Sequence, residues 1–404
     1  MLNKGQQRIH DAALHNLYTG RNLVYEYGGA AGTGKTYTLY QICKDSGIPM
    51  SHILPMAYTG AAATVLRKKG FPTATTLHSG LYTAIEVPNP NFKKILDADQ
   101  INHEFGLPNM SPTITKFVPK KTLPNIDLIV IDEGRMVPSY MKDIIESYDI
   151  PIIVTGDYNQ LDPVGDKPAY LVDNYDILDE IMRQDAQSAI VYIAHRILRG
   201  EPIDTGNYGN QVLVIEEDDL SDPMILASNL VICGTNATRD IWNKYIRENL
   251  LGFHGNLPNY GERLICRKND HCTEVDGIEL SNGLIGFAAN QPDASGFDGR
   301  SFYLDFLPDI LVSPFKNLVC DYEYFSSPAK VRLHYNNPYN HGQRFEYGYC
   351  ITTHLSQGSE ANRGIYIDEW MGNGNPEMQK KLQYTGVTRF KESMIFVKRK
   401  RRYY

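Results

Sequence analysis

The stretch from Gly29 to Thr36 constrains the fold of this chain more than any other feature. It reads Gly-Ala-Ala-Gly-Thr-Gly-Lys-Thr and fits the pattern Gly-x4-Gly-Lys-Ser/Thr. It follows an apolar run at 23–27 and precedes a helical pattern at 36–45, which is the strand–loop–helix context that the pattern requires. The glycines let backbone N–H groups turn towards phosphate oxygens, and the helix N-terminus adds partial positive charge. The sequence therefore predicts a nucleoside triphosphate site on an α/β sheet.

Polar residues after two further apolar runs complete the predicted site. Two carboxylates, Asp132 and Glu133, end a run of apolar residues, where they are costly unless they serve a cation. We expect Thr36 and Asp132 to hold Mg²⁺, Lys35 to reach the phosphates, and Glu133 to deprotonate the attacking water. Gln160, after the next run, is predicted to sense the γ-phosphate or its water. The loop residues predicted to bind the nucleotide are Gly29, Ala30, Ala31, Gly32, Thr33, Gly34, Lys35 and Thr36.

Apolar runs alternate with helical patterns along the chain. Buried parallel strands are predicted at 23–27, 53–56, 127–131 and 152–155, and helices at 6–18, 36–45 and 61–69. This alternation is typical of a doubly wound α/β layer. A second α/β unit is predicted from apolar runs at 229–233, 347–352, 364–367 and 394–397.

Two stretches interrupt this alternation. Residues 84–122 are rich in proline and show little periodicity, so they are interpreted as an insertion in the first unit. Residues 262–342 are rich in Gly, Asp, Asn and aromatic residues, with short β-like runs such as 301–306. They predict a small all-β insertion in the second unit.

Composition limits the remaining possibilities. The net charge is −7, so nucleic-acid binding has to come from a local groove rather than from overall charge. No apolar run approaches the length of a membrane-spanning helix, and no membrane partner is expected. The polar start of the chain and six cysteines without a Cys-x-x-Cys pair indicate a reducing compartment, the cytoplasm.

Several motifs, taken in order, resemble those of superfamily 1 DNA helicases, in the 5′ to 3′ branch that contains RecD and the minimal phage motor Dda. The segment at 156–164 is a close match to the family's G-D-x-x-Q-L-x-P-V. Further segments that resemble family motifs lie at 2–6, 58–62, 76–78, 180–184, 352–360 and 384–389.

The resemblance implies two RecA-like P-loop NTPase domains. The first would span 1–180, with 84–122 as a small pin-like insertion that splits the duplex. The second would span 181–261 and 343–404, with an SH3-like β insertion at 262–342. Phe92, Phe105 and Phe117 are candidates to stack on the last base pair, or else they pack the hairpin onto its own domain.

The resemblance also implies roles for single residues. Gln6 would read adenine, Gly358 and Glu360 would touch the nucleotide, and two arginines would meet the γ-phosphate. The implied catalytic residues are Lys35, Glu133, Gln160, Arg183 and Arg389. The implied DNA contacts are Thr59, Gly60, Thr76 and His78 from the first unit, and Thr353, His354 and Ser356 from the second.

Three positions depart from the family pattern. Gly134-Arg135 follows the two carboxylates where relatives usually have a small residue and Ser, and Tyr58 stands where Pro is common. Leu355 replaces the usual Lys of the H-K-S-Q segment, which is expected to weaken one phosphate contact and with it the affinity for DNA.

Together these observations predict a monomeric ATP-dependent DNA helicase that uses ATP and Mg²⁺, translocates 5′ to 3′ on single-stranded DNA and unwinds duplexes. Its expected partners are single-stranded DNA, duplex junctions and proteins of replication or recombination. Two alternatives remain open. One is an RNA helicase of the same branch; the other is a nucleotide-gated DNA-binding module without unwinding, which the changes at 134–135 and 355 would allow.

Overall fold

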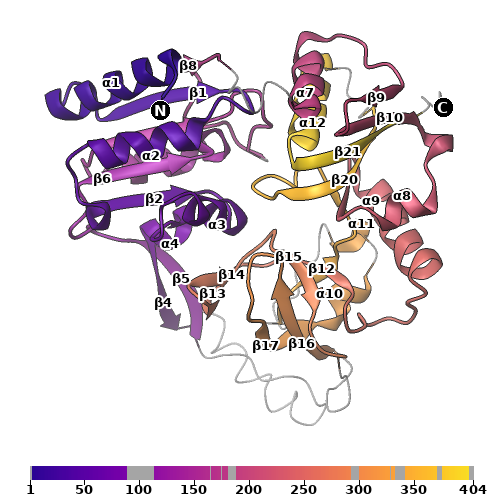
Figure 1. Ribbon diagram of the computed structural model, residues 1–404. Coiled ribbons are helices and arrows are strands. Elements are labelled where there is room, and N and C mark those ends of the chain that lie inside the picture. The colour runs from indigo at the N-terminus through magenta and orange to yellow at the C-terminus, as the bar shows by residue number, and fades with distance from the viewer. Residues whose placement is uncertain are drawn as a thin grey trace.

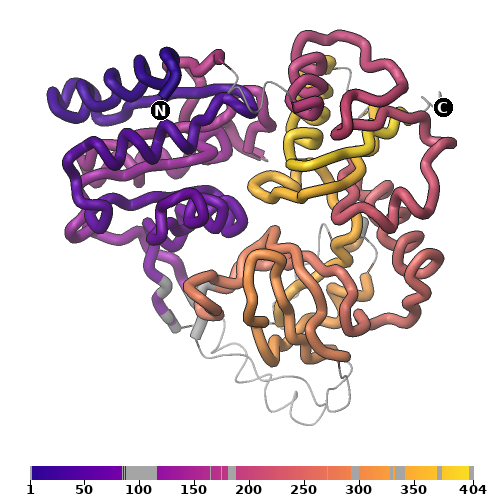
Figure 2. Tube along the Cα trace, in the orientation of Figure 1, coloured from indigo at the N-terminus to yellow at the C-terminus, as the bar shows by residue number. Residues whose placement is uncertain are grey.

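The computed structural model describes residues 2–88, 113–163, 165–173, 175–180, 188–292, 300–327, 329–332, 342–370 and 375–399. Two sheet-and-helix units lie side by side, and a smaller β-sheet lies beside both (Figure 1). The described part of the chain begins in the first unit and ends in the second (Figure 2). The predicted α/β class with two RecA-like units is confirmed. None of the helices described here is long and apolar enough to span a bilayer.

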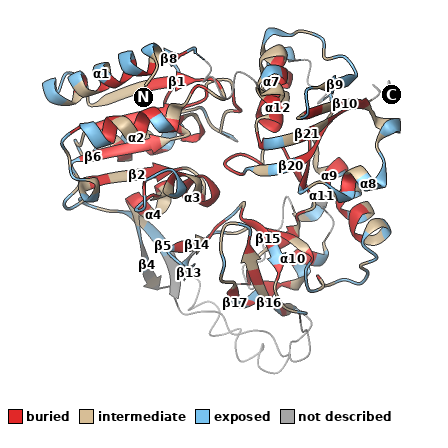
Figure 3. Cartoon of the chain, in the orientation of Figure 1, coloured by how far each residue is buried: buried red, intermediate tan, exposed pale blue. Residues whose placement is uncertain are grey.

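The first unit is a six-stranded sheet in the order β3-β2-β6-β7-β1-β8, and its strand pairs are parallel. Its strands are β1 (Val24–Gly29), β2 (Ile53–Ala57), β3 (Thr75–Thr76), β6 (Leu128–Asp132), β7 (Ile152–Gly156) and β8 (Asp176–Leu178). Its helices are α1 (Lys4–Thr19), α2 (Lys35–Asp45), α3 (Gly60–Lys68), α4 (Leu77–Leu81) and α6 (Lys142–Glu146). The central strands are buried on both faces (Figure 3), which explains their continuous apolar sequences.

Sheet order brings the predicted nucleotide residues to one edge. β6, β7 and β1 are consecutive neighbours, and their carboxyl ends lead into the carboxylates, the Gln160 loop and the P-loop. Ligands of open α/β sheets bind outside the carboxyl ends of the strands, so this edge is the expected location.

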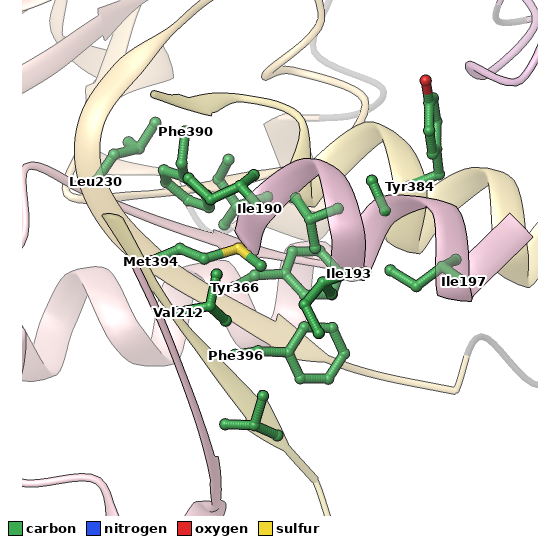
Figure 4. Close-up of a cluster of buried hydrophobic side chains, with 14 of the residues drawn as sticks. Ile190, Ile193, Ile197, Val212, Leu230, Tyr366, Tyr384, Phe390, Met394 and Phe396 are labelled. Carbon is green, nitrogen blue, oxygen red and sulfur yellow. The ribbon is translucent and has the colours of Figure 1, made fainter. Parts of the chain in front are cut away.

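The second unit has a six-stranded sheet in the order β19-β11-β20-β21-β10-β9. The strands are β9 (Gly206–Tyr208), β10 (Val212–Glu216), β11 (Leu230–Cys233), β19 (Cys350–Thr352), β20 (Ala361–Asp368) and β21 (Phe390–Lys398). The helices are α7 (Ala189–Arg199), α8 (Asp222–Leu226), α9 (Asn236–Lys244) and α12 (Pro376–Val387). β9 pairs antiparallel and the other pairs are parallel. Figure 4 shows the core between this sheet and helices α7 and α12, which includes Ile193, Met394 and Phe396.

The segment between β11 and β19 forms an antiparallel sheet in the order β17-β16-β15-β12-β18, with a hairpin of β13 and β14. The strands are β12 (Arg263–Cys266), β13 (Asp270–Val275), β14 (Ile278–Leu280), β15 (Ile285–Ala288), β16 (Ser301–Pro308), β17 (Phe315–Asp321) and β18 (Phe345–Tyr347). The short helices α10 (Tyr322–Ser326) and α11 (Ala329–Arg332) follow β17. This part has its own core, rich in phenylalanine. β18 lies beyond residue 342, where the sequence placed the end of the insertion.

The predicted pin-like segment is described at its base. β4 (Tyr82–Pro88) and β5 (Thr113–Pro119) pair antiparallel, and Phe117 is exposed on β5. Phe92 and Phe105 lie outside the described residues, so the pin role stays a prediction.

Candidate nucleotide-binding cleft

A pocket of about 530 Å³ lies between the two units. The first unit contributes Ala31, Gly32, Gly34, Lys35, Thr36, Tyr37, Tyr40, Ala62, Val65, Lys69, Asp132, Glu133, Asp157 and Gln160. The second unit contributes Gly358, Glu360, Thr388 and Arg389. Most of the predicted nucleotide residues therefore meet in one cavity, with the two units forming opposite walls.

The P-loop adopts the conformation that its glycines allow. Gly32 and Gly34 have φ angles of 82° and 79°, in the left-handed region that favours glycine. Lys35 Nζ donates to the carbonyl of Ala30 at 3.0 Å and lies 3.9 Å from Asp157 Oδ2. The lysine ammonium is thus held at the loop, beside a buried carboxylate.

Two oxygen donors suited to a hard cation lie together next to the loop. The Thr36 hydroxyl donates to Asp132 Oδ2 at 2.9 Å. Mg²⁺ in nucleotide sites typically uses one or two protein oxygens together with phosphate oxygens, so this pair fits the ion. Lys69 Nζ, at the end of α3, donates to the same hydroxyl at 3.4 Å. Lys69 was not predicted from the sequence, because it lies at the end of a helical pattern and belongs to no motif.

Glu133 has the environment of a general base. Its φ of 55° is unusual for a residue other than glycine, and its N–H donates to Asp132 Oδ1 at 2.9 Å. Burial and the neighbouring Asp132 raise the pKa of Glu133, whereas Arg389 and Lys35 act to lower it. A carboxylate with a raised pKa between two cations suits proton abstraction from water.

Gln160 is 5% exposed and lines the pocket. Its Oε1 is buried and has no hydrogen-bond partner among the described residues. A buried amide oxygen without a partner is costly, and a water molecule at the phosphates would satisfy it. The sensing role of Gln160 stays a prediction.

Arg389 follows α12 and is 6% exposed. Its Nε donates to the carbonyl of Thr385 at 3.0 Å, and its Nη2 donates to the Thr388 hydroxyl at 3.3 Å. These bonds hold the guanidinium on the second unit's wall of the pocket. The other predicted arginine finger, Arg183, lies outside the described residues and stays a prediction.

The remaining predicted nucleotide residues differ in accessibility. Gly358 and Glu360 line the pocket, and Glu360 forms an ion pair with Lys391. Gln6 is fully buried, and its Nε2 donates to the P-loop carbonyl of Thr33 at 3.0 Å. Gln6 thus supports the P-loop from outside the pocket. Its contact with adenine stays a prediction. Tyr37 and Tyr40, which the sequence did not single out, line the pocket.

In the first unit, two predicted DNA-binding residues act as helix caps. The hydroxyls of Thr59 and Thr76 accept from N–H groups of α3 and α4, each at 3.2 Å. The ring of His78 stacks on Tyr82, with centroids 5.6 Å apart. Their DNA contacts stay predictions.

The β13–β14 hairpin of the insertion approaches these predicted DNA-binding residues. Gly60 leaves no room for a side chain, because a Cβ there would lie 2.0 Å from Ser281 Oγ of the insertion. The Ser79 hydroxyl donates to Glu279 Oε2 on β14 at 2.6 Å. The acidic side chain of Glu279, in the insertion, is therefore bonded to Ser79 on α4 of the first unit.

In the second unit, Thr353 and Ser356 are fully buried. The Thr353 hydroxyl donates to the carbonyl of Cys233 on β11 at 3.2 Å, and the Ser356 hydroxyl donates to the carbonyl of Thr353 at 2.8 Å. His354 is half-buried, and burial lowers its pKa. Leu355 packs against the core of the second unit, which explains an apolar residue at this position. Direct DNA contacts by Thr353 and Ser356 would require these two hydrogen bonds to break, and they stay predictions.

The loop after β7 bonds to the second unit, which the sequence did not indicate. Leu161 donates its N–H to the Thr385 hydroxyl and accepts from Gln357 Nε2, both at 3.2 Å. Asp162 lies 3.3 Å from Lys381 Nζ on α12. Arg135 lies 2.7 Å from the same carboxylate. The unusual Arg135 therefore belongs to an ionic link between the units.

Comparison with known proteins agrees with this geometry. A model of the AAA domain family matches residues 1–219, and the chain belongs to this family. The uncharacterized protein R530 of Acanthamoeba polyphaga mimivirus is 29% identical over an alignment of 205 residues that covers 46% of this chain and 40% of that protein. The chain thus spans less than half the length of this curated relative.

The fold is shared with Pif1 helicases. A Pif1 helicase from Candida albicans has a TM-score of 0.53 at 15% identity, covering 98% of this chain and 94% of its own. A Pif1 helicase from Bacteroides in complex with ADP-AlF3 and single-stranded DNA has a TM-score of 0.51 at 15% identity, with coverages of 98% and 92%. A Pif1 structure at forked double-stranded DNA has a TM-score of 0.54 at 17% identity, with the same coverages. The chain thus belongs to the AAA domain family and has the fold of Pif1 helicases. The Dda-like subtype stays a prediction.

Proposed function

We propose that this chain is an ATP-driven DNA helicase that moves 5′ to 3′ on single-stranded DNA and unwinds duplexes. One observation carries the proposal: Lys35 and Glu133 face Arg389 across a pocket that both units line. An arginine finger contributes roughly 10³ to 10⁵ to the rate of phosphoryl transfer. Turnover is therefore fast only when the units are closed together, and each cycle moves the units relative to each other.

The chain's own residues divide the chemistry between them. Lys35 and the P-loop amides hold the phosphates, and Glu133 takes a proton from the water that Gln160 orients. Arg389 supplies positive charge from the opposite wall. When bound by Thr36 and Asp132, Mg²⁺ supplies neutralising charge on the phosphate oxygens.

The DNA substrate and the polarity are inferred from the resemblance and from the Pif1 structures with single-stranded and forked DNA. The segments that would grip DNA lie on both units, so closure would change their spacing. The grip would be mostly on phosphates, and binding should weaken steeply with salt.

The decisive experiment compares ATP hydrolysis with and without single-stranded DNA, and then unwinding of duplexes with a 5′ or a 3′ tail. We expect DNA-stimulated hydrolysis and efficient unwinding of the 5′-tailed duplex. Preferential unwinding of the 3′-tailed duplex would overturn the polarity and leave the ATPase assignment standing. Stimulation by RNA alone would favour an RNA helicase, and DNA-stimulated hydrolysis without strand separation would favour a nucleotide-gated binding module.

A further inference from the structure

Tyr384 joins the second unit to the phosphate-binding loop. It lies on α12, its side chain is fully buried, and its ring belongs to the core between α7 and the sheet. Figure 4 shows its hydroxyl pointing away from the other residues of this core. The ring therefore anchors the residue in the second unit, while the hydroxyl points out of that core.

That hydroxyl bonds twice to the first unit. It accepts from the N–H of Ala31 in the P-loop at 2.6 Å and donates to Oδ2 of Asp157. The same Asp157 oxygen lies 3.9 Å from Lys35 Nζ. Burial and the Asp157 carboxylate raise the pKa of Tyr384 well above its usual value, so the hydroxyl keeps its proton for Asp157.

Tyr384 is also tied to the turn that carries Arg389. The N–H of Thr388 donates to the carbonyl of Tyr384 at 3.1 Å, and Arg389 Nε donates to the carbonyl of Thr385, the next residue. Because this turn is short and hydrogen-bonded, fixing Tyr384 against the P-loop also fixes the start of the arginine side chain.

We propose that Tyr384 is a positioning residue that aligns the Arg389 turn with the P-loop through Ala31 and Asp157. The inference rests on the proposed function, because it assigns the alignment to an arginine finger. Tyr384 acts through Arg389 rather than on the phosphates. A shift of the P-loop or of Asp157 therefore moves Tyr384 and, with it, the turn that carries Arg389.

The test uses Tyr384→Phe, which keeps the buried ring and removes both hydrogen bonds. Its matched control is Tyr25→Phe, because the Tyr25 hydroxyl donates to Asp176 at 2.6 Å within the first unit, outside the pocket. The first readout is hydrogen exchange of the peptide that contains Ala31, measured on the full chain without nucleotide. We expect about 10- to 100-fold faster exchange there in Tyr384→Phe, and no change in the control.

The second readout is steady-state ATP hydrolysis with single-stranded DNA. Misplacement of the finger should lower kcat about 10-fold or more while KM for ATP changes little. A residue that only fills the core would change neither readout, because phenylalanine fills it equally, and the thermal midpoint checks that it does.

Wild-type P-loop exchange together with wild-type kcat in Tyr384→Phe would overturn the proposal. Faster exchange with unchanged kcat would also overturn it, since the hydroxyl would then hold the loop without aligning the finger. Failure of the proposed function has a different signature: the wild-type chain itself would hydrolyse no ATP with any nucleic acid.

Discussion

Replacing Arg389 with alanine tests the closed cleft directly. Arg389 is 6% exposed, and two hydrogen bonds of its own turn hold its guanidinium at the wall of the pocket. We expect the DNA-stimulated kcat to fall about 10³-fold or more, which corresponds to about 4 kcal/mol of transition-state stabilisation. KM for ATP should change far less, because the P-loop remains intact.

The same substitution makes a second prediction about pH. Arg389 is one of the two cations that lower the pKa of Glu133. Without it, that pKa rises further, so a smaller fraction of Glu133 is ionised at a given pH, and the acid limb of the residual activity moves to higher pH. Arg389→Lys should keep the acid limb near its wild-type position but still lower kcat, because an ammonium does not reproduce the guanidinium fork.

The assay is the pH profile of kcat with saturating single-stranded DNA. Arg363→Ala is the control, because it removes the same charge from the same unit. Arg363 lies on β20, its side chain is 63% exposed, and it pairs with Glu392. The reasoning is refuted if Arg389→Ala retains normal kcat, or if its acid limb coincides with that of the wild-type chain.

Three further substitutions test other parts of the site. Glu133→Gln should bind a fluorescent ATP analogue normally but hydrolyse ATP at least about 10²-fold more slowly, because an amide does not take the proton; a normal rate would remove Glu133 from the base role. Lys381→Met removes the ion pair with Asp162 that links the two walls of the pocket, so it should weaken nucleotide affinity by about 0.5 to 1 kcal/mol, as expected for a partly exposed ion pair, and should make that affinity less sensitive to salt; a wild-type nucleotide affinity at low salt would exclude a contribution of this ion pair to nucleotide binding. Glu279→Gln should tighten binding of single-stranded DNA severalfold at low salt, with the difference fading as salt rises; equal affinities at low salt would place Glu279 away from the DNA path.

The nucleotide site was predictable because its signals are local. The P-loop is contiguous, and Asp132 and Gln160 each follow an apolar run, so parallel strand order alone brings them together. Arg389 required the resemblance, since nothing near it in the sequence indicates which pocket it faces.

Contacts across the cleft could not be predicted in this way. Ala31 and Tyr384 are 353 positions apart, and a tyrosine in an amphipathic helix has the same pattern whether its hydroxyl faces solvent or another unit. The buried Thr353 and Ser356 illustrate the converse limit, because a hydroxyl that donates to a backbone carbonyl cannot be distinguished in sequence from one that faces DNA. Leu355 looked like the loss of a phosphate contact, whereas its packing against the core gives the substitution a structural reason.

The division between strong and weak contacts explains how such a chain could work as a motor. Each unit is held by a buried apolar core and a mostly parallel sheet, so it moves as a body. The loop after β7 instead reaches the second unit through single polar contacts, at Asp157, Leu161 and Asp162. Each such contact contributes roughly 1 to 3 kcal/mol, so the units can separate while the apolar core of each stays intact. Because Gln160 lies in the middle of that loop, a change at the γ-phosphate acts on the same few residues that hold the units together.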